Sequence, residues 1–463
     1  MKMKKTLAML LAGILTTMSL AGCGGKKAAD GVTEFTIGNA PTSAQASYDN
    51  YMKKVDEFNA AHPEYKMLTS DYTYDTKNFA AKAAGGTLPT TYVSHFTEIG
   101  MISQNGYCAD IAPYMEELGL IESYNPDILN VVRGENGEIW GLPHEAYCQG
   151  LTVNKKLFKE AGLVNDDGTV KFPKSWDELS EFAKQIKDKT GQAGFVIPTT
   201  DNCGGWHFIN VAWSYGTKFM EQDKDGKWKA TFNSPEFKKA CEWLYDLRWN
   251  KDAVYTDKTA IAVADIAQIF GANQAGMMLY NPPTSVLTNT YGMTPKDIAC
   301  GRLPEGPAGR YAQSGGSVVF FNADATPEQI RGALKWYIEK GGWNTEVTDE
   351  TLARSEEGLK NSIEQKDIIL DRPEAFPKFI EYEGRDKELE LQKKYMNIEP
   401  KDYDDYFSFE DVKVTPEEPV CCQELYAVMD GIIQEIMTNQ NVNLDELIKT
   451  AVNDFQSNHL DNL

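Results

Sequence analysis

Residues 137–179 read GEIWGLPHEAYCQGLTVNKKLFKEAGLVNDDGTVKFPKSWDEL, and this stretch decides the expected fold. Near its end, Ser175 and Glu178 form an S-x-x-E capping box, a pattern typical of the first turn of a helix. The apolar residues that follow the box recur at helical spacing. We therefore predict an amphipathic helix over residues 175–189.

The order of three pieces within the stretch says more than the helix alone. A strand reaches Gly141-Leu142-Pro143, an Asn-Lys-x-Leu-Phe-x-x-Ala-Gly-Leu segment follows at 154–163, and Pro-x-Ser-Trp-Asp-Glu-Leu opens the next helix at 173–179. This order resembles the bacterial extracellular solute-binding lipoproteins of sugar ABC transporters, the maltose-binding-protein-like family 1. In that family the first piece leads the chain into the second lobe.

The resemblance implies an α/β, two-lobed periplasmic-binding-protein (type II) fold. Each lobe is expected to be a mainly parallel sheet flanked by helices, with the ligand cleft at the hinge. Residues 33–144 and about 318–370 would form the first lobe, and residues 145–317 and about 371–463, with the C-terminal helices, the second. Strand-like segments alternate with helical periodicity after residue 33, which independently favours an α/β lobe.

The N-terminus has the pattern of an export signal. Lysines among the first five residues precede an apolar run at 7–20 that is too short to span a bilayer as a folded anchor. The run ends in Leu-Ala-Gly-Cys, which resembles the lipobox of bacterial lipoproteins. We predict a lipoprotein signal peptide at 1–22, then lipidated Cys23 and a flexible tether at 23–32. The alternative is an ordinary signal with a chance cysteine.

The chain is strongly acidic, with a formal net charge of −22, and loss of the signal lysines takes this to about −25. Such a charge disfavours nucleic-acid binding and gives no electrostatic help with polyanionic ligands. The cysteines besides Cys23 are odd in number and lack C-x-x-C or zinc-like spacing, so we expect mostly buried thiols and no metal or cofactor. They are Cys108, Cys148, Cys203, Cys241, Cys300, Cys421 and Cys422.

Two regions depart from the family pattern or resist interpretation. Where relatives carry Gly-Pro-Trp, this chain has Asn281-Pro282-Pro283, so the aromatic platform is absent and Tyr280 is its candidate substitute. The charged stretch at 345–418 is the hardest to interpret: its part around Glu388 to Tyr395 has helical spacing, and Pro400 to Pro419 is expected to be an acidic loop.

A sugar site needs aromatic rings that stack on C–H faces and polar side chains that bind hydroxyl groups. The resemblance places the loops that face the cleft, and residue types then choose candidates within them. The candidate ligand-binding residues are Asn39, Thr42, His95, Glu98, Glu145, Tyr147, Asp201, Asn202, Trp206, Tyr280, Asn281 and Ser314, with Thr97 beside Glu98.

Each candidate has a structural alternative. Trp206, Tyr147 and Tyr280 could pack in the core, and His95 and Glu98 could belong to a solvated loop or a local salt bridge. Two Asp- and Gly-rich segments, at 166–168 and 223–226, could suggest calcium, but hairpin turns explain them more simply.

The leading hypothesis is a lipid-anchored, extracytoplasmic, monomeric protein that is not an enzyme. It would deliver an oligosaccharide to ABC permease subunits, with lobe closure as the sensed event. Alternatives on the same scaffold are a polyol, a glycerol-phosphate ester or a peptide as ligand, and the lack of an Arg/Lys cluster in the cleft loops argues against the ester. A surface glycosidase would need two suitably spaced carboxylates, and none lies in a hydrolase motif. An adhesin would show no ligand-dependent closure.

Overall fold

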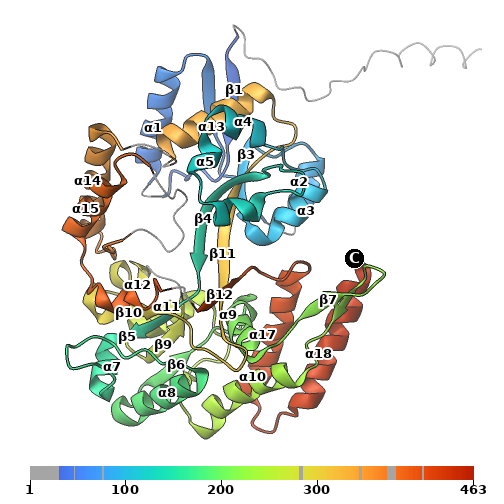
Figure 1. Ribbon diagram of the computed structural model, residues 1–463, viewed down its shortest axis with the longest axis vertical. Coiled ribbons are helices and arrows are strands. Elements are labelled where there is room, and N and C mark those ends of the chain that lie inside the picture. Colours follow the sequence, from blue (N-terminus) through green and yellow to red (C-terminus); the bar gives the residue numbers. More distant parts are fainter. Residues whose placement is uncertain are drawn as a thin grey trace, which may run out of the picture.

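The computed structural model describes residues 31–45, 47–75, 78–280, 285–341, 343, 347–372, 382–408 and 411–463, with the backbone alone at Asp127 and Glu145. Two of the candidates above, Cys23 and Asn281, lie outside these residues. The described chain forms two lobes joined by long strands (Figure 1). None of the helices in the described part is both long and apolar enough to cross a membrane.

A six-stranded sheet of order β12-β11-β3-β1-β2, with β4 also paired to β11, forms the first lobe, and its β12 end extends into the second lobe, where Val412 packs against a core cluster. β1 is parallel to β2 and β3, because crossover helices connect these strands. The strands are β1 (Thr33–Ile37), β2 (Tyr65–Thr69), β3 (Thr91–His95), β4 (Gly141–Cys148), β11 (Arg310–Phe321) and β12 (Val412–Thr415). The main helices are α1 (Tyr48–Ala61), α2 (Phe79–Ala84), α3 (Ile99–Gln104), α4 (Ala112–Glu117), α5 (Leu120–Ser123), α6 (Pro126–Leu129) and α13 (Pro327–Lys340).

The strands β4 and β11, here called the crossing strands, run antiparallel from the first lobe into the second (Figure 1). Their register places Gly315 opposite Tyr147 and Gly316 opposite Ala146. A Cβ atom on Gly315 would lie 2.6 Å from the Tyr147 ring, so the tyrosine occupies the space that a larger residue would fill. The two lobes are therefore linked by paired strands in which the Tyr147 ring lies close against the backbone of Gly315.

The second lobe contains a four-stranded sheet of order β10-β5-β9-β6. The expectation of a mainly parallel sheet is wrong here, because β5 is antiparallel to both neighbours and only β6 and β9 are parallel. β5 enters this sheet directly from the crossing strand β4, whereas its neighbours β9 and β10 come from much later in the chain. The strands are β5 (Leu151–Asn154), β6 (Ala193–Val196), β9 (Ala275–Leu279) and β10 (Ile298–Gly301), and β7 (Met220–Gln222) and β8 (Trp228–Ala230) form a separate hairpin.

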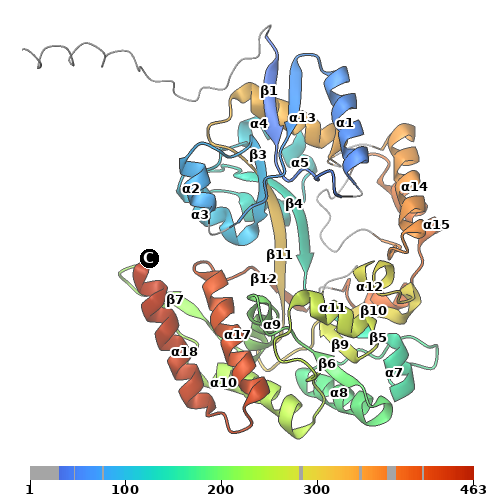
Figure 2. The same cartoon turned by 180° about the vertical axis from the view of Figure 1, so that it is seen from behind.

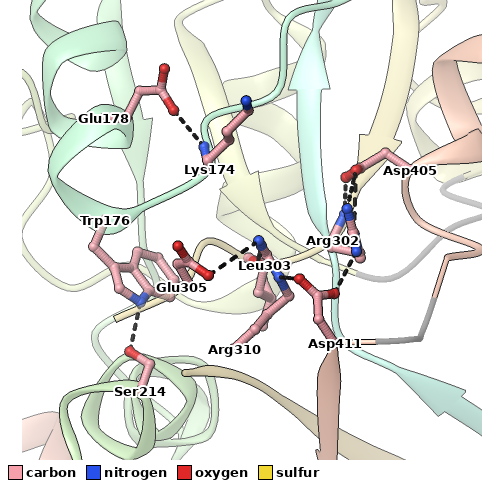
Figure 3. Close-up of polar contacts among 10 residues, drawn as sticks. All are labelled: Lys174, Trp176, Glu178, Ser214, Arg302, Leu303, Glu305, Arg310, Asp405 and Asp411. Atoms are coloured by element: carbon pink, nitrogen blue, oxygen red, sulfur yellow. Dashed lines mark hydrogen bonds and ion pairs between the residues drawn. The ribbon is translucent and has the colours of Figure 1, made fainter. Parts of the chain in front are cut away.

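Helices cover the second sheet, and the helix starts follow their sequence signals. The N-caps Ser175 and Ser234 accept hydrogen bonds from the N–H groups of Glu178 and Phe237. Half of the expected capping box is wrong: the Glu178 carboxylate accepts from the Lys174 N–H at 2.6 Å, one residue before the cap (Figure 3). The helices are α7 (Lys155–Ala161), α8 (Trp176–Thr190), α9 (Cys203–Tyr215), α10 (Pro235–Tyr245), α11 (Val263–Gly271), α12 (Ser285–Asn289), α17 (Cys422–Thr438) and α18 (Leu444–Asn458).

The acidic stretch is more ordered than its composition indicates. It contains α14 (Asp349–Glu364), α15 (Arg385–Tyr395) and α16 (Lys401–Asp404) as well as β12, so the expected loop from Pro400 to Pro419 is wrong. α14 and α15 lie on one side of the crossing strands, and α2, α3 and α17 lie on the other (Figures 1 and 2). The helix expected around residues 388–395 is confirmed as α15.

Ion pairs explain why a charged segment takes a fixed path. Arg302 donates to both Asp405 (Nη2 to Oδ1, 2.9 Å) and Asp411, and Arg310 donates to Asp411 (Nε to Oδ2, 3.2 Å) (Figure 3). The side chain of Arg310 is only 8% exposed, so this pairing neutralises a charge that burial would otherwise disfavour. The pairs hold β12 next to β11, a contact between segments about one hundred residues apart.

Three hydrophobic clusters account for the core. One fills the first lobe, and two fill the second around its sheet and C-terminal helices. Ile368 and Leu370 pack in a second-lobe cluster, so the chain reaches that lobe before residue 370. Five of the seven described cysteines are buried thiols, and the Asp- and Gly-rich segments form tight turns.

Candidate inter-lobe binding cleft

A cleft of about 490 Å³ opens between the lobes beside the crossing strands, and we call it the inter-lobe cleft. Its walls come from the first lobe, the start of α9, the crossing strands and the start of α17. A volume in this range is typical of small-molecule sites. The lining residues are Tyr74, Asp75, His95, Thr97, Glu98, Tyr147, Asp201, Asn202, Cys203, Trp206, Gly315, Gly316, Glu417, Gln423 and Tyr426.

The first-lobe wall is organised around Glu98. The Tyr74 hydroxyl donates to the Glu98 carboxylate at 2.6 Å, and the Thr97 hydroxyl donates to it at 3.2 Å. His95, the last residue of β3, meets the Tyr74 ring edge-on with centroids 6.1 Å apart. Burial, and then the hydrogen bond to Glu98, raise the pKa of Tyr74, so this hydroxyl remains a neutral donor. The wall thus presents a half-buried carboxylate held by two hydroxyl groups.

Two aromatic rings meet where the crossing strands border the cleft. Tyr147 and Trp206 lie edge to face, with ring centroids 6.3 Å apart. Trp206 comes from the first turns of α9, and both rings are partly exposed to the cleft. Such rings offer apolar faces with polar edges, an arrangement suited to the C–H faces and hydroxyl rims of polyhydroxylated molecules.

The second-lobe wall is the N-terminus of α9, and a carboxylate from α17 already occupies it. Asp430 accepts from the backbone N–H groups of Asn202 (2.7 Å) and Gly205 (2.8 Å). Burial raises the pKa of Asp430 even though these bonds act in the opposite direction. Helix N-termini are ready anion sites, so Asp430 fills the position that a ligand phosphate would otherwise use.

Glu417 completes the cleft from the segment before α17. The Tyr426 hydroxyl donates to its carboxylate at 3.0 Å, and the Gln313 amide lies at 3.5 Å. Burial raises the pKa of Glu417 to about 7, and the negative charge of Glu98 adds to this effect. The hydrogen bonds from Tyr426 and Trp206 oppose the rise without cancelling it.

The structure brings seven of the sequence candidates together in the inter-lobe cleft: His95, Thr97, Glu98, Tyr147, Asp201, Asn202 and Trp206. They meet because the loops that follow β3 and β6 open at the same side of the crossing strands. The backbone of Glu145 pairs with Ser317 across the crossing strands, and its side chain is not described.

Four further candidates lie outside the cleft lining. The Asn39 side chain, just after β1, accepts from the N–H group of Val93 in β3 at 3.0 Å and so ties this loop to the strand. Thr42 lies on an exposed turn, where its N–H donates to Gln45. The Tyr280 ring stacks on the buried His207 ring, with ring centroids 6.5 Å apart. The Ser314 hydroxyl donates to the Thr415 carbonyl.

Sequence reasoning missed several lining residues. Gly315 and Gly316 follow Ser314 directly, and their small size is a signal of close approach. Glu417, Gln423 and Tyr426 had no such signal, because they come from a remote acidic segment and the helix after it. Tyr74, Asp75 and Cys203 lie next to predicted elements but were not singled out.

Comparison with known proteins places this geometry in a family. The family model described as "Bacterial extracellular solute-binding protein" matches residues 42–342. A protein of Brucella abortus (strain 2308), named as a binding protein, is 26% identical over 254 residues, 53% of this chain and 57% of the relative. The match thus spans a little over half the length of that relative.

Solved structures share the fold over nearly the whole chain. The maltose-bound MalE3 of T. maritima is 20% identical with a TM-score of 0.65, covering 92% of this chain and 98% of that one. UgpB of Mycobacterium tuberculosis in complex with glycerophosphocholine is 14% identical with a TM-score of 0.65, at the same coverage. These similarities confirm the expected type II periplasmic-binding-protein fold. The chain therefore belongs to the bacterial extracellular solute-binding protein family.

Proposed function

We propose that this protein captures a carbohydrate in the inter-lobe cleft and delivers it to the permease of an ABC importer. The observation that carries the proposal is the pairing of the Tyr147 and Trp206 rings with a rim of hydroxyl, amide and carboxylate groups from both lobes. A sugar needs both features at once, because it presents apolar faces and many hydroxyl groups. The maltose bound by the T. maritima relative agrees with this ligand class.

Capture would work by hinge closure and involve no bond making. β4 and β11 connect the lobes as a paired ribbon, so a rotation of one lobe relative to the other narrows the cleft between Glu98 and α9. The ligand stabilises the closed form to the extent that it contacts both lobes at once. The permease would then recognise the closed arrangement.

The same proposal covers the place of action. The N-terminal segment supports export followed by lipid attachment at Cys23, which would hold a monomer at the outer side of the cell membrane. Mass spectrometry of the protein purified from membranes tests this, since a lipidated N-terminal Cys23 is expected. A product that begins at another residue would contradict the anchor and leave sugar capture unaffected.

The direct test is thermal melting of the chain from Gly24 onward against mono- and oligosaccharides, polyols, glycerol-phosphate esters and peptides. A ligand at about one hundred times its dissociation constant stabilises a protein by roughly 2.7 kcal/mol. We expect a shift with one sugar class that Trp206→Ala abolishes and that Trp228→Ala, on the separate β7–β8 hairpin, retains. A shift with peptides or phosphate esters alone would refute the carbohydrate assignment.

A further inference from the structure

The inter-lobe cleft has a pronounced charge asymmetry. Its lining contains four carboxylate residues and, among the described residues, no lysine or arginine. Glu98 contributes from the first lobe and Glu417 from the second-lobe side, and the charge of Glu98 acts directly on Glu417. The described partners of both carboxylates are neutral: hydroxyl groups for Glu98, and Tyr426, Gln313 and Trp206 for Glu417.

From this arrangement, and resting on the proposed function, we propose that the cleft selects a polyhydroxylated ligand bearing a protonated amine, held between Glu98 and Glu417. Glu98 and Glu417 line the same cleft, so closure removes water from both carboxylates, and their repulsion strengthens as the local dielectric falls. A cationic group between them converts this repulsion into two charge-assisted hydrogen bonds.

An ammonium group fits these partners better than a metal ion does. It donates three hydrogen bonds, whereas Ca²⁺ takes six to eight oxygen ligands. Among the described residues, no three His, Cys, Asp or Glu side chains converge to hold a metal ion. At the second-lobe wall, Asp430 already caps the start of α9, so that wall offers no free anion site. Anionic sugars and phosphate esters are therefore disfavoured.

The groups around Glu417 define what the amine must displace or meet. Tyr426 and Cys422 face it from α17, Gln313 from β11, Trp206 from α9 and Glu98 from the first lobe. Without a cationic ligand, the repulsion between the two carboxylates on closure is relieved when Glu417 takes up a proton. Burial and the charge of Glu98 already raise the pKa of this carboxyl group above its ordinary value. A neutral sugar should therefore bind with proton uptake, and an amine-bearing sugar with proton release.

The experiment compares glucosamine oligosaccharides with their N-acetylated counterparts and with glucose oligosaccharides of equal length, by calorimetry of the mature protein. The measurement is made at about pH 6, where an amine that titrates no higher than an α-amino group, at about 7.7–8.0, is still mostly protonated. We expect at least about tenfold tighter binding of the amine, as for a charge-assisted hydrogen bond, and a heat in two buffers that reports proton release. Glu417→Gln should remove the preference for the amine-bearing sugar. The neighbouring Glu418 accepts a hydrogen bond from Trp213 away from the cleft, so Glu418→Gln should retain the preference.

Three results would overturn the charge selection and leave sugar capture intact. They are equal or weaker binding of the amine-bearing sugar, binding of a neutral sugar that requires Ca²⁺, and an equal effect of the two glutamine variants. Preferred binding of phosphate or uronate sugars would overturn it as well. Absence of binding by every sugar in the set would instead overturn the proposed function. The comparison of ligands on the unaltered protein does not depend on whether a variant folds.

Discussion

Glu417→Gln should change the pH dependence of stability in a direction that the structure dictates. Burial and the nearby Glu98 raise the pKa of Glu417 from the ordinary 4.5 to about 7. Each tenfold change in proton affinity corresponds to about 1.4 kcal/mol, so ionising this group in the folded protein costs up to about 3 kcal/mol. Glutamine has the same shape and never ionises, so the variant avoids this cost.

The sign follows from proton binding. Below about pH 4.5 the carboxyl group is protonated in both folded and unfolded chains, and its stabilising contribution is fully present. Between about 4.5 and 7 the unfolded chain loses the proton first, so the parent protein loses stability relative to the variant, and the difference levels off above about 7. Urea unfolding of both proteins at a series of pH values measures the difference directly.

Two parallel stability profiles would refute this reasoning, because they would mean that Glu417 ionises as easily in the folded protein as in the unfolded chain. Tyr426→Phe provides an independent check. Its hydroxyl lowers the pKa of Glu417 by donating to the carboxylate. Removing it should therefore extend the falling part of the profile to higher pH, and a shift to lower pH would contradict the assigned hydrogen bond.

Two further predictions concern backbone positions at the cleft. Gly315→Ala places a Cβ atom 2.6 Å from the Tyr147 ring, so it should cost about 1–3 kcal/mol of unfolding free energy and weaken ligand binding. The control Gly431→Ala, in α17, meets no atom within 4 Å and should stabilise the protein by up to about 1 kcal/mol. Denaturant unfolding compares the two variants, and an equal effect would refute the close contact. Asp430→Ala removes the acceptor for two N–H groups at the start of α9 and should cost about 1–3 kcal/mol of unfolding free energy. Amide hydrogen exchange should become faster in the first turn of α9 alone. Unchanged exchange there would show that the carboxylate does not cap the helix.

Features that depend on neighbouring residues were predicted better than features that depend on contacts between remote parts of the chain. α8 begins directly after Ser175, the residue that opens its predicted helix, because capping and propensity act over a few residues. The loops at 95–98 and 201–206 were placed by the family resemblance, and residue types then singled out the candidates within them. β12 was missed because this four-residue strand lies within an acidic segment and forms only through its pairing with β11, next to the ion pairs of Arg302 and Arg310.

The sequence by itself determined the α/β character, the family, the helix starts and roughly half of the residues that line the cleft. These features depend on short-range periodicity, on capping and on the order of motifs along the chain. Only the tertiary structure decided the antiparallel path of β5, the occupation of the α9 N-terminus by Asp430 and the presence of Glu98 and Glu417 in one cleft. The physical reason is that strand direction, burial and the pKa of a carboxyl group depend on neighbours from remote parts of the chain, which no local pattern encodes.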